Sequence, residues 1–359
     1  MAAKFPYRKE SIPVVSLDQW KALYSVTEKV RRLQPWKIIY DTDLFGLEDP
    51  VTKQIGLVSV LGALGEHHAV QLFLPPEGLL FWLEFFRTGE PDRNFAMFNL
   101  RMLQAEFTSK KSLTKPDLFI REQLGLAGPI HRAHGYPLFR SHRPRYAPWY
   151  VEAEEARLLE LALSAALEFT PRRARGEEPD LMDDQLGLQL PELSIYSLVE
   201  GKLNTIRRAR PPIEQPSAVS PPIIDVLDAA TIHRLQALPI GDDIWQAGAC
   251  FFPSPVAEGG RPYFPVAPLI MDEETEFVLE TTLDSNLQLD PAWAVVRAVA
   301  AAAVKANRLP AMVRVAAKQT EKALGTLQPY CPGVQIEFSP HLDLLHSAMV
   351  SLQSRFLRS

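Results

Sequence analysis

Apolar residues recur at helical spacing in two long stretches of the N-terminal half. Over 16–33 they fall on one face of a helix, and Ser16 and Gln19 stand three positions apart, as a capping box requires. Residues 151–170 predict a second long helix. Glu152 and Glu155 lie near its start, where the helix dipole favours anions. We expect prolines to end both helices, Pro35 the first and Pro171 the second.

Shorter apolar runs between these helices predict strands. The connection at 62–68 indicates that two of the strands form a hairpin, and Glu200-Gly201 indicates a second hairpin further along the chain. The nearly all-apolar segment 79–87 predicts a buried helix. The expected strands are 36–40, 55–61, 69–74, the second half of 95–107, 193–199 and 203–208.

The C-terminal third has the clearest order of elements. Two strands come first, and Asp290-Pro291 then begins a long alanine-rich helix with proline in the favoured first position. Strands and helices alternate after it. The order β-β-α-β-α-β-α predicts helices packed on a mixed sheet. The strands are 268–271, 276–282, 311–315 and 334–338, and the helices are 292–307, 318–327 and 340–357.

The length of 359 residues and the 47% of apolar residues are typical of a globular protein with two domains. The polar, charged segment 171–190 is the predicted boundary. We therefore expect an α+β fold with an N-terminal domain at 1–175 and a C-terminal domain at 185–359. Each is predicted to be a small mixed or antiparallel sheet packed with helices.

Charge and cysteine content exclude several classes of protein. The net charge of −5 weighs against bulk attraction to nucleic acid or to an anionic membrane. Cys250 and Cys331 form no paired motif, which argues against a disulfide framework and a cysteine-based zinc site. The first residues lack a hydrophobic signal core, and no apolar run is long enough to span a bilayer. We expect a cytoplasmic protein without a membrane partner and without a cofactor.

The stretch 131–150 combines four arginines with five aromatic residues. Such side chains bind phosphates and stack on bases, and arginine also pairs with the carboxylates of an acidic protein partner. The structural alternative is that the loop wraps its own domain and its arginines pair internally. With the net negative charge, an acidic protein partner is favoured over nucleic acid. The candidate binding residues are Arg140, Arg143, Arg145, Tyr146 and Trp149.

Carboxylates offer weaker candidates for metal binding and catalysis. Asp41 and Asp43 have the oxygen ligands that Mg²⁺ or Ca²⁺ prefers, but a solvated turn that leads into a strand is the favoured explanation. Asp272 lies between two strands whose order is similar to that of ribonuclease-H-like nucleases, which bind two metal ions with carboxylates on adjacent strands. Glu337 and Asp343 are the only further carboxylates offered for such a site. The alternative is that Asp272 lies in a hairpin turn.

Other signatures of chemistry are weak or absent. His67-His68 lie in a predicted hairpin loop, and His131 and His134 have no cysteine or acidic ligand at matching spacing, so no zinc site is expected. The sequence contains no nucleophile elbow, no Walker P-loop and no G-x-G-x-x-G.

Several short motifs, taken together, resemble an uncharacterised bacterial two-domain family whose N- and C-terminal domains are both of unknown function. The resemblance spans roughly 20–341 and implies architecture rather than activity. Some relatives carry a cysteine-rich SEC-C zinc motif, which this chain lacks. The motifs are Pro35-Trp36, the run from Asp43 to Asp49-Pro50, Gly62, Gly65-Glu66, Glu77-Gly78-Leu79, Pro137, Phe139-Arg140, Tyr146, Pro148, Trp149 and Arg261-Pro262-Tyr263.

Three functional hypotheses follow. The favoured one is a non-catalytic protein that binds a partner, because arginine and aromatic residues are enriched at binding hot spots. The second is a metal-dependent enzyme that processes nucleic acid through Asp272, in a degenerate ribonuclease-H-like C-terminal domain. The third is a nucleic-acid-binding module without catalysis.

Overall fold

The chain forms two compact units in the computed structural model. The structure describes residues 14–65, 67–88, 100–126, 128, 135–178, 190–212, 221–258, 260–287 and 290–357. The N-terminal unit consists of Met1–Pro216 together with Gly259–Arg261, and the C-terminal unit of Ser217–Glu258 and Pro262–Ser359.

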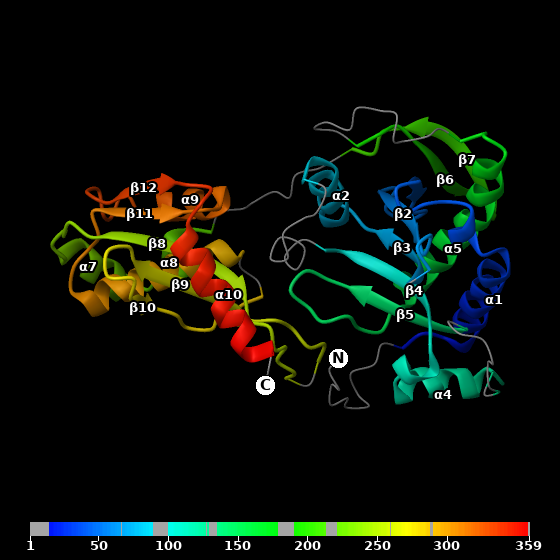
Figure 1. The fold of residues 1–359 in the computed structure, drawn as a ribbon, viewed down its shortest axis with the longest axis horizontal. Coiled ribbons are helices and arrows are strands. Elements are labelled where there is room, and N and C mark those ends of the chain that lie inside the picture. Colours follow the sequence, from blue (N-terminus) through cyan, green and yellow to red (C-terminus); the bar gives the residue numbers. More distant parts are fainter. Residues whose placement is uncertain are drawn as a thin grey trace. The chain divides into compact units, whose positions relative to one another are not determined.

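A seven-stranded sheet organises the N-terminal unit (Figure 1). Its order is β5-β4-β3-β2-β1-β6-β7. Neighbouring strands are antiparallel except for β1 and β6, which are parallel. The strands are β1 (Phe45–Glu48), β2 (Ile55–Leu61), β3 (His68–Phe73), β4 (Met102–Thr108), β5 (Tyr136–His142), β6 (Leu193–Val199) and β7 (Lys202–Ala209).

Helices cover both faces of this sheet. The long helices α1 and α5 pack against each other and bury one face, and α2 packs on the other. The predicted capping box of Ser16 and Gln19 is present at the start of α1. The helical segments are α1 (Leu17–Leu33), η2 (Pro35–Lys37), α2 (Glu77–Thr88), η3 (Lys110–Ser112), α4 (Lys115–Gln123) and α5 (Ala153–Ala174).

The C-terminal unit has a five-stranded sheet in the order β10-β9-β8-β11-β12. Strands β8, β9 and β10 are antiparallel, whereas β11 runs parallel to both β8 and β12. Helix α8 buries one face and α10 packs on the other, where Gly248 gives it room: an added Cβ would lie 2.8 Å from the Met349 methyl group. The elements are α6 (Ile223–Val226), α7 (Ala229–Ala237), β8 (Ile244–Phe251), β9 (Val266–Asp272), β10 (Val278–Glu280), α8 (Pro291–Ala306), β11 (Met312–Val315), α9 (Lys318–Gly325), β12 (Gln335–Phe338) and α10 (Asp343–Leu357).

The α+β prediction is confirmed, and from β9 onward the C-terminal order is the predicted one. Strand β8 was missed. The second predicted hairpin, β6 and β7, is present, but it extends the N-terminal sheet through the pairing of β6 with β1. The two compact units therefore divide after this hairpin, at Pro216, whereas the sequence placed the boundary before it.

Three local predictions were wrong. The expected strand at 36–40 is a 3₁₀ turn, because Gln34 takes a left-handed conformation and Pro35 opens the turn. Part of the expected loop at 131–150 is strand β5, which tolerates Pro137 at the edge of the sheet. Helix α5 continues past Pro171. Within the described part of the chain, no helix has the length and apolar character to cross a membrane.

Candidate functional site

The arginine- and aromatic-rich stretch folds back on itself. After β5 the chain turns, and Trp149 pairs with Ser141 through two backbone hydrogen bonds, of 2.8 and 3.0 Å. This return places the side chains that follow β5 against helices α4 and α5. His131 and His134, at the beginning of the stretch, lie outside the described residues.

Arg140 is held by a carboxylate from α4. Its two terminal nitrogens donate to the two oxygens of Asp117 at 3.0 and 2.7 Å, and its guanidinium lies 4.9 Å from the Tyr150 ring centre. Asp117 also accepts from the backbone and hydroxyl of Thr114, as the third residue of the α4 capping box. Only 13% of the Arg140 side chain is exposed, so its guanidinium binds groups of its own unit rather than solvent.

Arg143 points at the start of α5. It donates to Glu152 and, at 3.0 Å, to Glu155, which also accepts from Arg101 at 2.8 Å and from the Ser141 hydroxyl at 2.9 Å. Burial alone would raise the pKa of Glu155. The Glu152 backbone N–H and the two guanidiniums outweigh burial and lower this pKa to about 2. The carboxylate is therefore charged and fully engaged at neutral pH.

A third guanidinium reaches the same place from far along the sequence. Arg261, which belongs to the N-terminal unit, donates to the carbonyls of Ala147 and Ser141 and lies 5.5 Å from the Tyr146 ring centre. Burial and the positive charge of Arg143 lower the pKa of Arg261. Burial and then the surrounding arginines, Arg261 first, lower the pKa of His142 to about 4, so this imidazole is neutral at pH 7.

Two of the remaining candidates are buried, and Tyr146 is partly exposed. Arg145 is 7% exposed and has a left-handed backbone with φ of 66°, and Trp149 is 5% exposed. The structure thus pairs Arg140 and Arg143 internally, as in the structural alternative. Partner binding by these five residues stays a prediction.

The acidic pair Asp41 and Asp43 divides between two roles. Asp43 is buried, accepts from the Tyr40 backbone at 2.8 Å and pairs with Arg173 at 2.9 Å. The backbone carbonyl of Asp41 accepts a hydrogen bond from the Ser59 hydroxyl. These contacts fix the turn that leads into β1.

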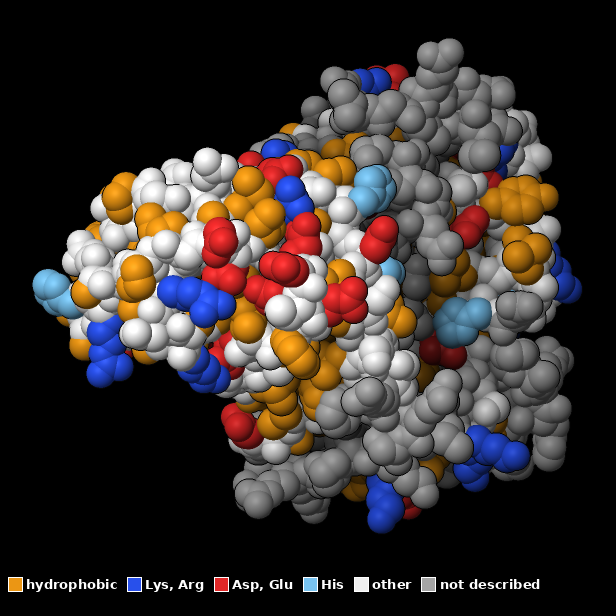
Figure 2. Space-filling model, turned by 60° about the vertical axis from the view of Figure 1, so that its left-hand side comes forward, with side chains coloured by type: hydrophobic (Ala, Val, Ile, Leu, Met, Phe, Trp, Pro, Cys, Tyr) orange, Lys and Arg blue, Asp and Glu red, His pale blue; other side chains and the backbone are white. Residues whose placement is uncertain are grey.

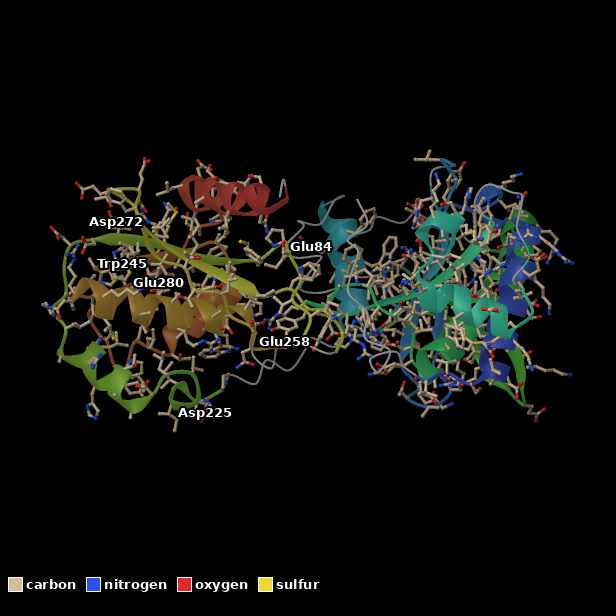
Figure 3. All side chains as sticks on the ribbon, turned by 90° about the horizontal axis from the view of Figure 1, so that it is seen from below. Glu84, Asp225, Trp245, Glu258, Asp272 and Glu280 are labelled. Carbon is tan, nitrogen blue, oxygen red and sulfur yellow. The ribbon has the colours of Figure 1, made fainter. Side chains whose placement is uncertain are left out.

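Asp272 ends β9 and closes the β9–β10 turn. Its carboxylate accepts from the backbone N–H of Thr275 at 2.8 Å and from its hydroxyl at 2.7 Å. Glu280, on the neighbouring strand, pairs with Lys305 and accepts a hydrogen bond from the Thr282 hydroxyl. Figure 3 labels Asp272 and Glu280. The two carboxylates therefore serve separate local contacts.

Glu337 lies on the opposite face of the sheet from Asp272. Asp272 is in register with Trp245, which packs in the α8 core, whereas Glu337 pairs with Arg314 in register with Gln246, on the face of α10. Acidic side chains gather on the visible face of the C-terminal unit (Figure 2), but the described residues contain no group of three or more potential metal ligands. The two-metal hypothesis gains no support from this arrangement.

A surface pocket of the N-terminal unit was not predicted from the sequence. It has a volume of about 590 Å³ and lies between the 3₁₀ turn η2 and the β2–β3 connection. The His68 ring stacks on Trp36 with centres 4.6 Å apart. The pocket is lined by Gln34, Trp36, Lys37, Ile38, Ile39, Tyr40, Gly62, Ala63, Gly65 and His68.

Glycine is required at one position of this wall. Gly62 has a φ of 131°, and a Cβ there would lie 2.4 Å from the His68 ring and 2.9 Å from the Trp36 Cβ. Gly65 also has a positive φ, of 81°, but meets no neighbour within 4 Å. The glycines and Trp36 are visible in the sequence. Their meeting depends on the turn after α1, which the sequence analysis read as a strand.

Comparison with known proteins identifies domains but no activity. Residues 20–187 match the family model of a domain of unknown function, DUF7309, and residues 231–353 match that of a second, DUF6930. Neither the curated proteins nor the solved structures include a match. The chain thus belongs to a two-domain family in which a DUF7309 domain is followed by a DUF6930 domain, both of unknown function.

Proposed function

We propose that the protein is a binding protein, and that the pocket lined by residues 34, 36–40, 62, 63, 65 and 68 receives an apolar or aromatic side chain of a partner protein. The observation that carries this proposal is the group of exposed apolar residues at and beside the pocket. Ile38 and Tyr40 line it and are 41% and 64% exposed, and Leu64, next to the lining residues Ala63 and Gly65, is 93% exposed. Large apolar side chains gathered around a concavity are typical of an interaction site.

The size and chemistry of the pocket fit an anchor residue. Pockets that bind ligands enclose roughly 300–1,000 Å³ and combine apolar walls with a few polar groups. Here the stacked rings of Trp36 and His68 supply an apolar wall, and Gln34 and Lys37 supply polar groups. An anchor side chain that fills the pocket would bury the exposed Tyr40 and Leu64 at the same time.

The wall is also rigid enough to bind without rearrangement. Trp36 is 6% exposed and touches Phe107 as well as His68, with ring centres 5.1 and 4.6 Å away. A side chain locked by its neighbours loses little conformational entropy when a partner binds. This preformed wall favours recognition of a partner side chain.

Selection of displayed peptides tests the proposal. Random peptides are selected on the wild-type protein and then titrated against the double variant Tyr40→Ser with Leu64→Ser. We expect the enriched peptides to share an aromatic or large aliphatic residue. Their affinity for the variant should fall by about 2 kcal/mol, roughly 30-fold, as at a binding hot spot.

The matched control is Phe119→Ser with Leu126→Ser, which removes two other exposed apolar residues, 59% and 41% exposed. Affinity for this control should equal that for the wild type. Peptides that bind both double variants as tightly as the wild-type protein would show that the pocket is not the site.

A further inference from the structure

The sequence R-R-A-R occurs twice in the chain, at 172–175 and at 207–210. The first copy lies at the C-terminal end of α5 and the second at the end of β7. The structure brings them together: Nη2 of Arg208 donates to the backbone carbonyl of Glu177, just after α5, at 3.1 Å. Two segments more than thirty residues apart thus share one surface.

The end of α5 is shaped to hold its arginines at this surface. Gly176, with a φ of 73°, donates to Arg173, and Glu177 donates to Arg172, the pair of bonds that defines a Schellman motif. Cations are favoured there because the helix dipole leaves negative charge at its C-terminal end. The chain then turns back, and the buried Glu178 accepts from Arg172 at 2.7 Å and from the Ser194 hydroxyl of β6.

The described side chains of this surface carry an excess of positive charge. We call it the arginine patch, and it consists of Arg172, Arg175, Arg208 and Arg210 with Glu177 and Glu178. Arg175 pairs with Glu177 at 2.5 Å and Arg172 with Glu178 at 2.7 Å, so the four positive charges against two negative ones leave a net charge of +2, whereas the whole chain carries −5. Arg175 is 57% exposed, and Arg208 and Arg210 are exposed as well. The patch is therefore opposite in sign to the molecule that carries it.

The surroundings of the patch favour a protein over a nucleic acid. Strand β7 ends the sheet, and the described residues place no strand beyond it, so part of its backbone edge can pair with an extended peptide. Phe169 of α5 and Tyr196 of β6, the strand that pairs with β7, are 3% and 1% exposed and offer no surface on which a base can stack.

We propose that the arginine patch binds an extended acidic segment of a partner protein. Guanidinium groups bind carboxylates through paired, charge-assisted hydrogen bonds, which Arg175 and Arg208 supply from two different elements. The patch shares no residue with the pocket lined by Trp36, Tyr40 and His68, and it binds through charge rather than through an apolar anchor.

Fluorescence anisotropy with three labelled probes tests this proposal on the full chain. The probes are a peptide of alternating glutamate and valine, the same peptide with glutamine in place of glutamate, and a single-stranded DNA of equal negative charge. We expect only the glutamate peptide to bind well, with an affinity that falls as salt is added. Arg175→Gln with Arg208→Gln should weaken this binding about tenfold or more, and the two lysine replacements should restore part of it.

The control variant removes equal charge elsewhere on the unit, through Arg32→Gln with Lys110→Gln, both exposed. It should bind like the wild type, and circular dichroism should show that all the variants are folded. Equal binding of the glutamate and glutamine peptides, equal loss in both double variants, or no binding of any probe would overturn the proposal. Tighter binding of the DNA, lost in the Arg175 and Arg208 variant, would replace the acidic segment with a nucleic acid.

Discussion

Two arginine-rich regions of the N-terminal unit have similar composition and opposite surroundings. In the stretch 136–150, which includes β5, 13% of the Arg140 side chain is exposed, and in the arginine patch 57% of the Arg175 side chain is exposed. Density of arginine in the sequence therefore does not distinguish an internal ionic network from an interaction surface. The distinction lies in the carboxylates that the fold brings to each guanidinium.

The two regions meet opposite ends of helices. Asp117 and Glu155 are each the third residue of a helix. Capping hydrogen bonds from the backbone of Thr114 and Glu152 hold these carboxylates in place beside the arginines. The arginine patch lies at the C-terminal end of α5, where the dipole favours cations and the exposed Glu177 comes from the same turn. Carboxylates fixed at helix N-termini thus pair with Arg140 and Arg143, whereas in the patch Arg172 pairs with the buried Glu178 and Arg175 remains 57% exposed.

The largest test of this contrast removes one carboxylate from each region. Glu155→Gln removes the negative charge that Arg101 and Arg143 share, and it puts an amide NH2 group in place of one of the two accepting oxygens; only 6% of the Glu155 side chain is exposed. We expect the free energy of unfolding, measured by urea denaturation, to fall by about 3–5 kcal/mol, as for a broken buried ion pair. Glu177→Gln should leave the stability unchanged within error. A similar loss of unfolding free energy in both variants would show that the two regions do not differ in this way.

The pH dependence of stability gives the next largest effect. Because the pKa of Glu155 is lowered from 4.5 to about 2 on folding, its stabilisation is fully present above pH 4.5 and is lost as the pH falls toward 2. The difference in unfolding free energy between the wild type and Glu155→Gln should therefore shrink by roughly 3 kcal/mol over this interval. A difference that stays constant from pH 5 to pH 2 would mean that the carboxylate is not held by the arginines.

The sequence predicted much of the fold because its strongest signals are local. The capping box at Ser16, the proline at the start of α8 and the alternating elements after β9 all depend on neighbours in sequence. Strand β8 was missed, and its burial depends on β9 and β11 on either side. The pairing of β6 with β1 joins segments almost 150 residues apart and has no local signal.

The candidate sites show the same limit. The sequence placed Glu155 in the first turn of a helix and singled out Arg143, but their contact at 3.0 Å depends on how β5 and α5 pack. The pocket also escaped prediction, because Trp36 and Gly62 meet only after the turn at Gln34. Residue types could be read from the sequence, but the contacts that decide between pairing and exposure could not.

A pair of double-mutant cycles compares the two regions at the level of single ion pairs. For Arg140 and Asp117, whose bidentate contact is largely shielded from solvent, we expect a coupling energy of about 2 kcal/mol from urea denaturation. For Arg175 and Glu177 the coupling should be indistinguishable from zero. A coupling between Arg140 and Asp117 as small as that of the exposed pair would place this arginine among the residues available to a partner.

The smallest expected effect comes from replacing arginine with lysine, which keeps the positive charge but not the planar guanidinium group. Lysine cannot reproduce the paired hydrogen bonds of Arg140 to Asp117 or its stacking on Tyr150, so Arg140→Lys should cost about 1 kcal/mol in unfolding free energy. Arg175→Lys should leave stability unchanged, since an exposed ammonium keeps the charge of the patch. Both variants are measured by thermal and urea unfolding at low and high salt. Added salt should change the stability difference between Arg140→Lys and the wild type less than it changes an exposed ion pair. An equal effect of salt on both variants would show that solvent reaches the guanidiniums of Arg140 and Arg175 alike.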